Sequence, residues 1–259
     1  MGCTSSRINV TYEEAAIING ENLLLYYNHN INDIFKLFQT NSKEGNVSKK
    51  HWKEIQKELG NISDESQQAK VNEFYKGIKT EKELKLSVLT TIAVLLCKGS
   101  GADKASVFFD AHDAKKLGQL PKSDVGAMID ELIEFASVKL PTLASPSDSV
   151  NTYTEEGMQV YKDRMKCGRN KDRDALLNAV SVDQEMVEKS VFVAWFSKED
   201  NGEWLRSTGL RTHLKKTGKR GTKDVKSKPV EEEAEKPKEN AEETGGKHRK
   251  KKVEAPEGS

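Results

Sequence analysis

Apolar residues recur at helical spacing along most of the chain between Thr11 and Leu214. Apolar positions about three to four residues apart are typical of amphipathic helices. We expect helices over 32–39, 51–60, 85–100, 123–140 and 154–167, followed by a last apolar helix over 182–196. Convincing runs of alternating apolar and polar residues, which would indicate strands, are absent from this sequence. The pattern therefore predicts an all-α fold.

Two segments between predicted helices share a layout that the apolar pattern does not explain. Residues 40–51 have Gly45 at the sixth position and Val47 at the eighth. Residues 113–124 have Gly118 and an apolar leucine at the same two positions. Glycine permits the positive φ of a sharp turn. A helix, a twelve-residue loop with glycine at its sixth position, and a second helix form the layout of an EF-hand.

On these residues the chain resembles the EF-hand superfamily, and within it the recoverin and neuronal calcium sensor group. Two weaker loops can be fitted. One runs over 77–88 with Leu84 at the eighth position, and the other over 173–184 with Asn178 at the sixth position and Val180 at the eighth.

The resemblance implies EF-hand-like helix–loop–helix pairs, at about 20–100 and 101–200. It also implies that the apolar eighth residues of two paired loops meet in a short β-bridge. The domain between residues 11 and 214 is therefore expected to be EF-hand-like.

The ligand positions depart from that family. A calcium loop needs oxygen donors at positions 1, 3, 5 and 9 and a bidentate glutamate at position 12. The loop at 113–124 begins with Asp113 but has Lys115 and Leu117 at the third and fifth positions. The loop at 40–51 has Glu44 as its single carboxylate and ends on His51. We expect no strong calcium binding and assign no metal ligand and no cofactor, although calcium stays open at these two loops.

The chain begins with a pattern for covalent lipidation. Gly2 and Ser6 match the N-myristoylation pattern, in which the acyl chain is attached to the glycine. Cys3 lies beside Gly2, where a second, palmitoyl chain would make membrane attachment stable. We expect 1–10 to be an acylated segment that holds the protein at the cytoplasmic face of a membrane, with a cytoplasmic pool.

Composition changes near residue 215. Residues 215–259 contain no aromatic residue, leucine, isoleucine or methionine, and their charge alternates in blocks, basic over 215–228, acidic over 231–243 and basic over 247–252. Such a segment buries too little apolar area to offset its ordering entropy. We therefore predict that 215–259 is a disordered charged tail.

The chemistry of the chain favours binding over catalysis. The sequence contains no nucleotide-binding, hydrolase or zinc motif, and its three cysteines lack the spacing of a metal site. No enzyme activity and no small-molecule substrate are expected. Charged residues make up 32% of the chain, but the net charge of +1 argues against a polyanion-binding protein, so no nucleic-acid partner is expected. The apolar run 86–97 is too short to span a bilayer.

These observations predict a membrane-anchored adaptor or regulatory protein whose helical body binds a protein partner, either an amphipathic helix or a membrane protein. Five aromatic residues either line a partner groove or form the core, namely Trp52, Phe192, Trp195, Phe196 and Trp204. The first alternative is a calcium sensor with a myristoyl switch. The second is a nuclear or nucleic-acid-associated factor that acts through its basic tail.

Overall fold

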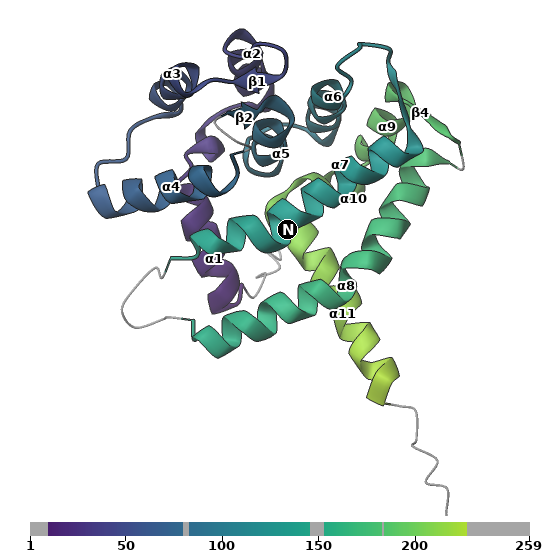
Figure 1. Ribbon diagram of the computed structural model, residues 1–259. Coiled ribbons are helices and arrows are strands. Elements are labelled where there is room, and N and C mark those ends of the chain that lie inside the picture. The colour runs from purple at the N-terminus through teal and green to yellow at the C-terminus, as the bar shows by residue number, and fades with distance from the viewer. Residues whose placement is uncertain (1–9, 80–82, 146–152, 183, 227–259) are drawn as a thin grey trace, which may run out of the picture.

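The computed structural model describes residues 10–79, 83–145, 153–182 and 184–226 (Figure 1). These residues form eleven α-helices and four strands of two or three residues. The predicted all-α class is confirmed.

The helices follow the chain in order, with short 3₁₀ and π segments between some of them. The α-helices are α1 (Tyr12–Asn22), α2 (Ile31–Thr40), α3 (Lys49–Leu59), α4 (Glu65–Gly77), α5 (Leu86–Leu96), α6 (Gly101–His112), α7 (Lys122–Glu134), α8 (Glu155–Ser181), α9 (Lys189–Phe196), α10 (Glu199–Gly202) and α11 (Ser207–Lys226). The 3₁₀ segments are Tyr26–Asn28, Leu140–Leu143 and Glu203–Leu205, and a π segment covers Phe135–Lys139. The strands are β1 (Asn46–Val47), β2 (Leu84–Lys85), β3 (Gln119–Pro121) and β4 (Met186–Glu188).

Helices α2, α3, α4 and α5 form one unit, which we call the N-terminal unit (31–96). Each half is a helix, a loop carrying a short strand, and a second helix, and the two strands pair antiparallel. Val47 lies opposite Leu84 in this pairing, and both side chains are buried. Gly45 has a φ of 77°, as its place in the loop requires. The pairing of the two eighth-position residues is the one that the resemblance implies.

The next four helices form the C-terminal unit (101–196) by the same arrangement. Strand β3 pairs antiparallel with β4, and Leu120 lies opposite Val187. Gly118 has a φ of 68°, again as expected for the turn before the strand. Both units therefore join their loops through a two-stranded sheet whose central side chains enter the core.

The predicted position of the fourth loop is wrong. Residues 173–184 were expected to be that loop, but α8 runs as one helix to Ser181, and Val180 is a buried helical residue. The strand instead contains Val187, seven residues later, so β4 and α9 occupy the range where a single helix over 182–196 was expected. Sequence spacing misplaced the loop because no glycine marks it, and two valines seven residues apart compete for the same position.

The predicted end of the folded region is also wrong. Helix α11 continues to Lys226, beyond the boundary expected at residue 215. Gly168 of α8 and Gly218 of α11 lie at the crossing of the two helices, where an added Cβ would stand 2.2 Å from the Leu214 carbonyl oxygen or 2.0 Å from the Arg164 carbonyl oxygen. Beyond Leu214, α11 has no leucine or aromatic residue, and at Gly218 it packs on α8 by close approach of the two backbones. The rest of the predicted tail, 227–259, lies outside the described residues.

The core runs continuously through both units. Helix α5 is buried along most of its length and packs against α2 and α6. Trp52, Phe192 and Phe196 are core residues, whereas Trp195 and Trp204 are partly buried against the core. Leu205, Leu210 and Leu214 are fully buried, so the segment after α9 folds back onto the helical body.

Candidate functional site

The two residues predicted to carry lipid, Gly2 and Cys3, lie outside the described residues. The first described residue is Val10, and Thr11 caps α1 by accepting a hydrogen bond from the Glu14 N–H. The position of α1 therefore fixes where Val10, the first described residue, lies on the body.

The loop at 40–51 closes on itself. The backbones of Lys43 and Asn46 exchange two hydrogen bonds, of 2.8 and 3.0 Å. Glu44 and Gly45 between them both have positive φ, 52° and 77°, as the two central residues of a type I′ turn require. The middle of this loop is thus a tight hairpin turn, and it offers a single carboxylate, Glu44, whose side chain is exposed.

In the loop at 113–124, Asp113 already binds backbone N–H groups with both carboxylate oxygens. Its Oδ1 accepts from the Leu117 N–H at 3.0 Å, and its Oδ2 accepts from the Gly118 N–H at 2.7 Å. Asp113 is buried and organises the turn. With Lys115 and Leu117 at the third and fifth positions, the loop supplies no second carboxylate there for a cation.

The other two loops do not improve the donor set. Residues 80–82 of the loop at 77–88 lie outside the described residues, and the loop between α8 and β4 begins with Val182 at a φ of 45°. Among the described residues no group of three or more His, Cys, Asp or Glu side chains is placed to hold a metal ion. The residues of the two candidate loops do not fit a calcium ion of ordinary affinity.

A buried charge cluster joins the two ends of the described chain. Arg211 of α11 is fully buried and donates to Glu14 at 2.8 Å and to Glu21 at 2.6 Å, both on α1. Lys215 pairs with Glu14 at 3.2 Å, and the Tyr161 hydroxyl of α8 donates to the same carboxylate. Burial opposes the charge of Arg211, but Glu21 and Glu14 outweigh burial and raise its pKa above the ordinary value. Two cations and two carboxylates balance, so this cluster is a structural tie between α1, α8 and α11.

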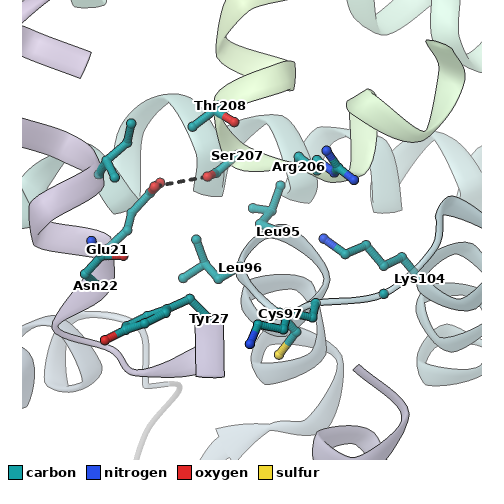
Figure 2. A pocket seen from close by; sticks show the side chains of 13 residues that line it. Glu21, Asn22, Tyr27, Leu95, Leu96, Cys97, Lys104, Arg206, Ser207 and Thr208 are labelled. Atoms are coloured by element: carbon teal, nitrogen blue, oxygen red, sulfur yellow. Dashed lines mark hydrogen bonds between the residues drawn. The ribbon is translucent and has the colours of Figure 1, made fainter. Parts of the chain in front are cut away.

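A cavity of about 420 Å³ lies beside this cluster (Figure 2). Its walls come from α1, the end of α5, the linker to α6, and the start of α11. The lining residues are Ile18, Glu21, Asn22, Tyr27, Leu95, Leu96, Cys97, Lys98, Gly99, Lys104, Arg206, Ser207 and Thr208. The lining carries three cationic side chains and one carboxylate, and that carboxylate, Glu21, is already bonded to Arg211 and to the Ser207 hydroxyl.

Lys104 is the unusual member of this lining. Lys104 is only 3% exposed, and its Nζ donates to the Leu205 carbonyl oxygen at 3.1 Å. Within the described part of the chain no carboxylate lies at ion-pair distance from it. Burial lowers the pKa of Lys104 to about 8, and Arg206 acts in the same direction, whereas Cys97 and the carboxylate of Glu203 act against them. Lys104 is therefore a buried ammonium whose hydrogen-bond acceptor is a carbonyl oxygen and not a carboxylate.

Cys97 also lines the cavity and is buried, as expected for a small apolar residue. Burial raises the pKa of its thiol to about 12. The thiolate that nucleophilic chemistry requires is thus disfavoured at this position.

Sequence reasoning missed Lys104 and the Arg211 cluster. A signal was present, because each charged residue sits on the apolar face of its helix. Lys104 precedes the buried Val107 and Phe108 by three and four residues, and Arg211 lies between Leu210 and Leu214. A charge at an apolar-face position indicates a buried ion, but its partner comes from another helix and cannot be read from the spacing.

In the described part of the chain, no helix combines the length and the apolar character needed to cross a membrane. Comparisons of the chain with protein-family models, with curated proteins and with solved structures found no match.

Proposed function

We propose that this protein is a lipid-anchored adaptor or regulatory protein, in which two degenerate EF-hand pairs form a scaffold that binds a protein partner at the cytoplasmic face of a membrane. The scaffold part of the proposal is supported by the antiparallel pairing of Val47 with Leu84 and of Leu120 with Val187. The donor sets of the loops support a structural use of these hands in place of calcium sensing.

The observation that carries the membrane part is where α1 begins. Glu14 binds Tyr161 of α8 and both Arg211 and Lys215 of α11. Glu13 lies against Gly157 in the first turn of α8. The segment that precedes α1, with the predicted acyl sites Gly2 and Cys3, therefore joins the body beside α8 and α11.

Helix α11 is rich in basic residues, which anionic lipid headgroups attract. Its twenty residues carry seven Lys or Arg and one Asp, and apart from Arg211 and Lys215, which belong to the buried cluster, five basic residues and one Asp remain. In Figure 1 its C-terminal half runs past α8 and away from the other helices. Arg164 of α8 and Lys216 of α11 are exposed near the crossing, and Val10 and Tyr12 are exposed at the start of α1. Basic residues near an acyl chain add attraction to anionic lipid, at about 1 kcal/mol each.

A partner surface is supported at the paired loops of the C-terminal unit. Leu117, Val182 and Met186 are large apolar residues that are 62%, 60% and 40% exposed. Large apolar side chains that remain exposed are frequent in interaction surfaces, and methionine adapts to varied partners.

Vesicle binding of the acylated protein tests the proposal. The chain would be co-expressed with an N-myristoyltransferase, its acyl group confirmed by intact mass, and its partition measured on phosphatidylcholine vesicles with and without phosphatidylserine. We expect binding that needs Gly2 and strengthens with phosphatidylserine. The double variant Arg164→Glu, Lys216→Glu should weaken binding to the anionic vesicles about tenfold or more. The matched control is Lys53→Glu, Lys57→Glu, which reverses two exposed charges on α3 and should leave binding unchanged.

Added calcium separates the proposal from the first alternative. Partition that is equal in calcium and in chelator supports an adaptor, whereas a calcium-dependent shift supports a myristoyl switch. Binding of a DNA or RNA duplex at physiological salt that is lost in the Arg164→Glu, Lys216→Glu variant would support the nucleic-acid alternative. Failure of Gly2→Ala to change partition would reject the lipid anchor.

A further inference from the structure

The cavity described above has the electrostatics of an anion site. Buried charged groups in proteins are paired or bound to an opposite charge, because burial of an isolated ion is costly. Among the described residues no carboxylate lies at ion-pair distance from Lys104, although Glu203 raises its pKa from farther away, while Arg211 of α11 has two carboxylates in direct contact. A molecule that enters the cavity could bring a negative charge into contact with Lys104.

Two further features face the same space. Arg206, which also pairs with Glu203 at 2.9 Å, lines the cavity with Lys104, and Figure 2 shows the charged ends of Lys104 and Arg206 on one side of it, opposite Glu21. The cavity also contains Ser207 and Thr208, the first two residues of the twenty-residue helix α11. The first N–H groups of a helix have no partner within the helix, and they favour anions.

We infer that this cavity binds a small organic phosphate, with the phosphate group between Lys104, Arg206 and the start of α11. A doubly charged phosphate suits a site with two cationic side chains and a helix N-terminus better than a singly charged carboxylate does. Ile18, Leu95 and Leu96 form an apolar wall, which would hold an apolar or planar body attached to the phosphate. A volume of about 420 Å³ accommodates such a molecule.

This site would give the protein a soluble ligand in addition to the membrane and a protein partner. Its walls join α1 and the start of α11 to the α5–α6 linker, which connects the N-terminal and C-terminal units. An occupied site would therefore tie together the three parts of the molecule that meet here. The inference does not depend on the acyl anchor.

Calorimetric titration with phenyl phosphate tests the site, with inorganic phosphate and benzoate as comparisons. We expect phenyl phosphate to bind most tightly, because its ring adds apolar burial and its head carries two charges. The Lys104→Met and Arg206→Gln variants should each weaken phenyl phosphate binding about tenfold or more. Lys53→Met, an exposed lysine on α3, is the matched control and should bind as the wild type does.

Amide chemical shifts locate the ligand independently. On addition of phenyl phosphate to the ¹⁵N-labelled protein, the amides of Ser207, Thr208 and Gly209 should shift first. Three results would overturn the inference: no binding of phenyl phosphate at about 10 mM, equal binding by wild type and by both the Lys104→Met and Arg206→Gln variants, or equal binding of benzoate. If Lys104→Met does not fold, Arg206→Gln, at a half-exposed side chain that also pairs with Glu203, still decides the question.

Discussion

Arg211 and Lys104 are both buried cations near the same end of the molecule, yet their surroundings differ. Arg211 is fully buried, and two carboxylates of α1 bind it at 2.6 and 2.8 Å. Lys104 is 3% exposed, and one carbonyl oxygen binds it. Their pKa values follow the surroundings, because the pKa of Arg211 is raised by Glu21 and Glu14 against the effect of burial, whereas burial lowers that of Lys104 to about 8.

The difference separates a charge that completes the fold from one that is left for a ligand. The carboxylates on Arg211 come from α1, more than 180 residues away in sequence, so that cluster closes the tertiary structure. The cavity beside Lys104 is where the compensating charge would stand.

Arg211→Met should cost about 3–5 kcal/mol of unfolding free energy, because it leaves Glu14 and Glu21 buried with a single remaining cation, Lys215. Urea unfolding followed by circular dichroism measures the loss. Arg164→Met, at an exposed site on α8, should change stability by less than about 0.5 kcal/mol and serves as the control. A cost for Arg211→Met as small as that of Arg164→Met would contradict the structural role of the cluster.

Lys104→Met should instead raise the free energy of unfolding in phosphate-free buffer. Replacing an uncompensated buried ammonium with an apolar side chain of similar length removes its burial cost, so the variant should be about 1–2 kcal/mol more stable than wild type. The same urea series measures this. Destabilisation by more than about 1 kcal/mol would mean that the Leu205 carbonyl bond already compensates the charge.

The pH dependence of stability should report Lys104 directly. Its folded pKa of about 8 lies below its unfolded value of 10.5, so above pH 8 the unfolded state binds more protons and stability rises with pH. The wild type should gain about 1 kcal/mol relative to Lys104→Met between pH 7.5 and 9. Burial raises the pKa of the Cys97 thiol in the folded protein, so this group lowers stability as the pH rises past about 9. Cys97 is present in both proteins. A constant difference between the two proteins across this range would show that Lys104 does not titrate as described.

Asp172 should give the smallest effect. It is buried, Thr217 donates to its Oδ1 at 2.7 Å, its Oδ2 is without a partner, and burial raises the pKa of its carboxyl. Asp172→Asn keeps an oxygen for Thr217 and removes the charge, so stability at pH 7 should rise by at most about 1 kcal/mol. Thermal unfolding at pH 7 and pH 4 checks this, since the advantage of the variant should shrink at pH 4, where Asp172 itself takes up a proton. An equal gain in stability from Asp172→Asn at pH 7 and at pH 4 would show that the carboxyl charge is not the cause of the gain.

Much of the local structure could be predicted from the sequence. Gly45 and Gly118 have the positive φ that their positions indicated, and Gly60 ends α3 as a glycine after an amphipathic helix commonly does. Thr154 caps α8 through the Gly157 N–H. These features depend on a few neighbouring residues, so a single stretch of sequence contains the information.

The errors arose where a distant segment overrides local preference. Helix α7 was expected to continue to a stop before Pro141, but the α-helix ends at Glu134 and is followed by a π segment and then by a 3₁₀ segment that contains the proline. The 215–226 part of α11 has a single apolar side chain larger than methyl in its sequence, Val225. It is helical because Gly218 lets it approach α8 and because Lys215 binds Glu14 and stacks over the Tyr161 ring.

The helical class, the glycine turns at Gly45 and Gly118, and the places of Val47, Leu84 and Leu120 between helices followed from the sequence, because helix periodicity and backbone freedom are local properties. Tertiary structure alone decided that Val187, and not Val180, meets Leu120, since strand register depends on which side chains fill the shared core. Only the folded chain shows that Arg211 meets two carboxylates whereas Lys104 meets a carbonyl oxygen. A charge on an apolar helix face is visible in the sequence, but its energy depends on atoms that only the folded chain brings within about 4 Å.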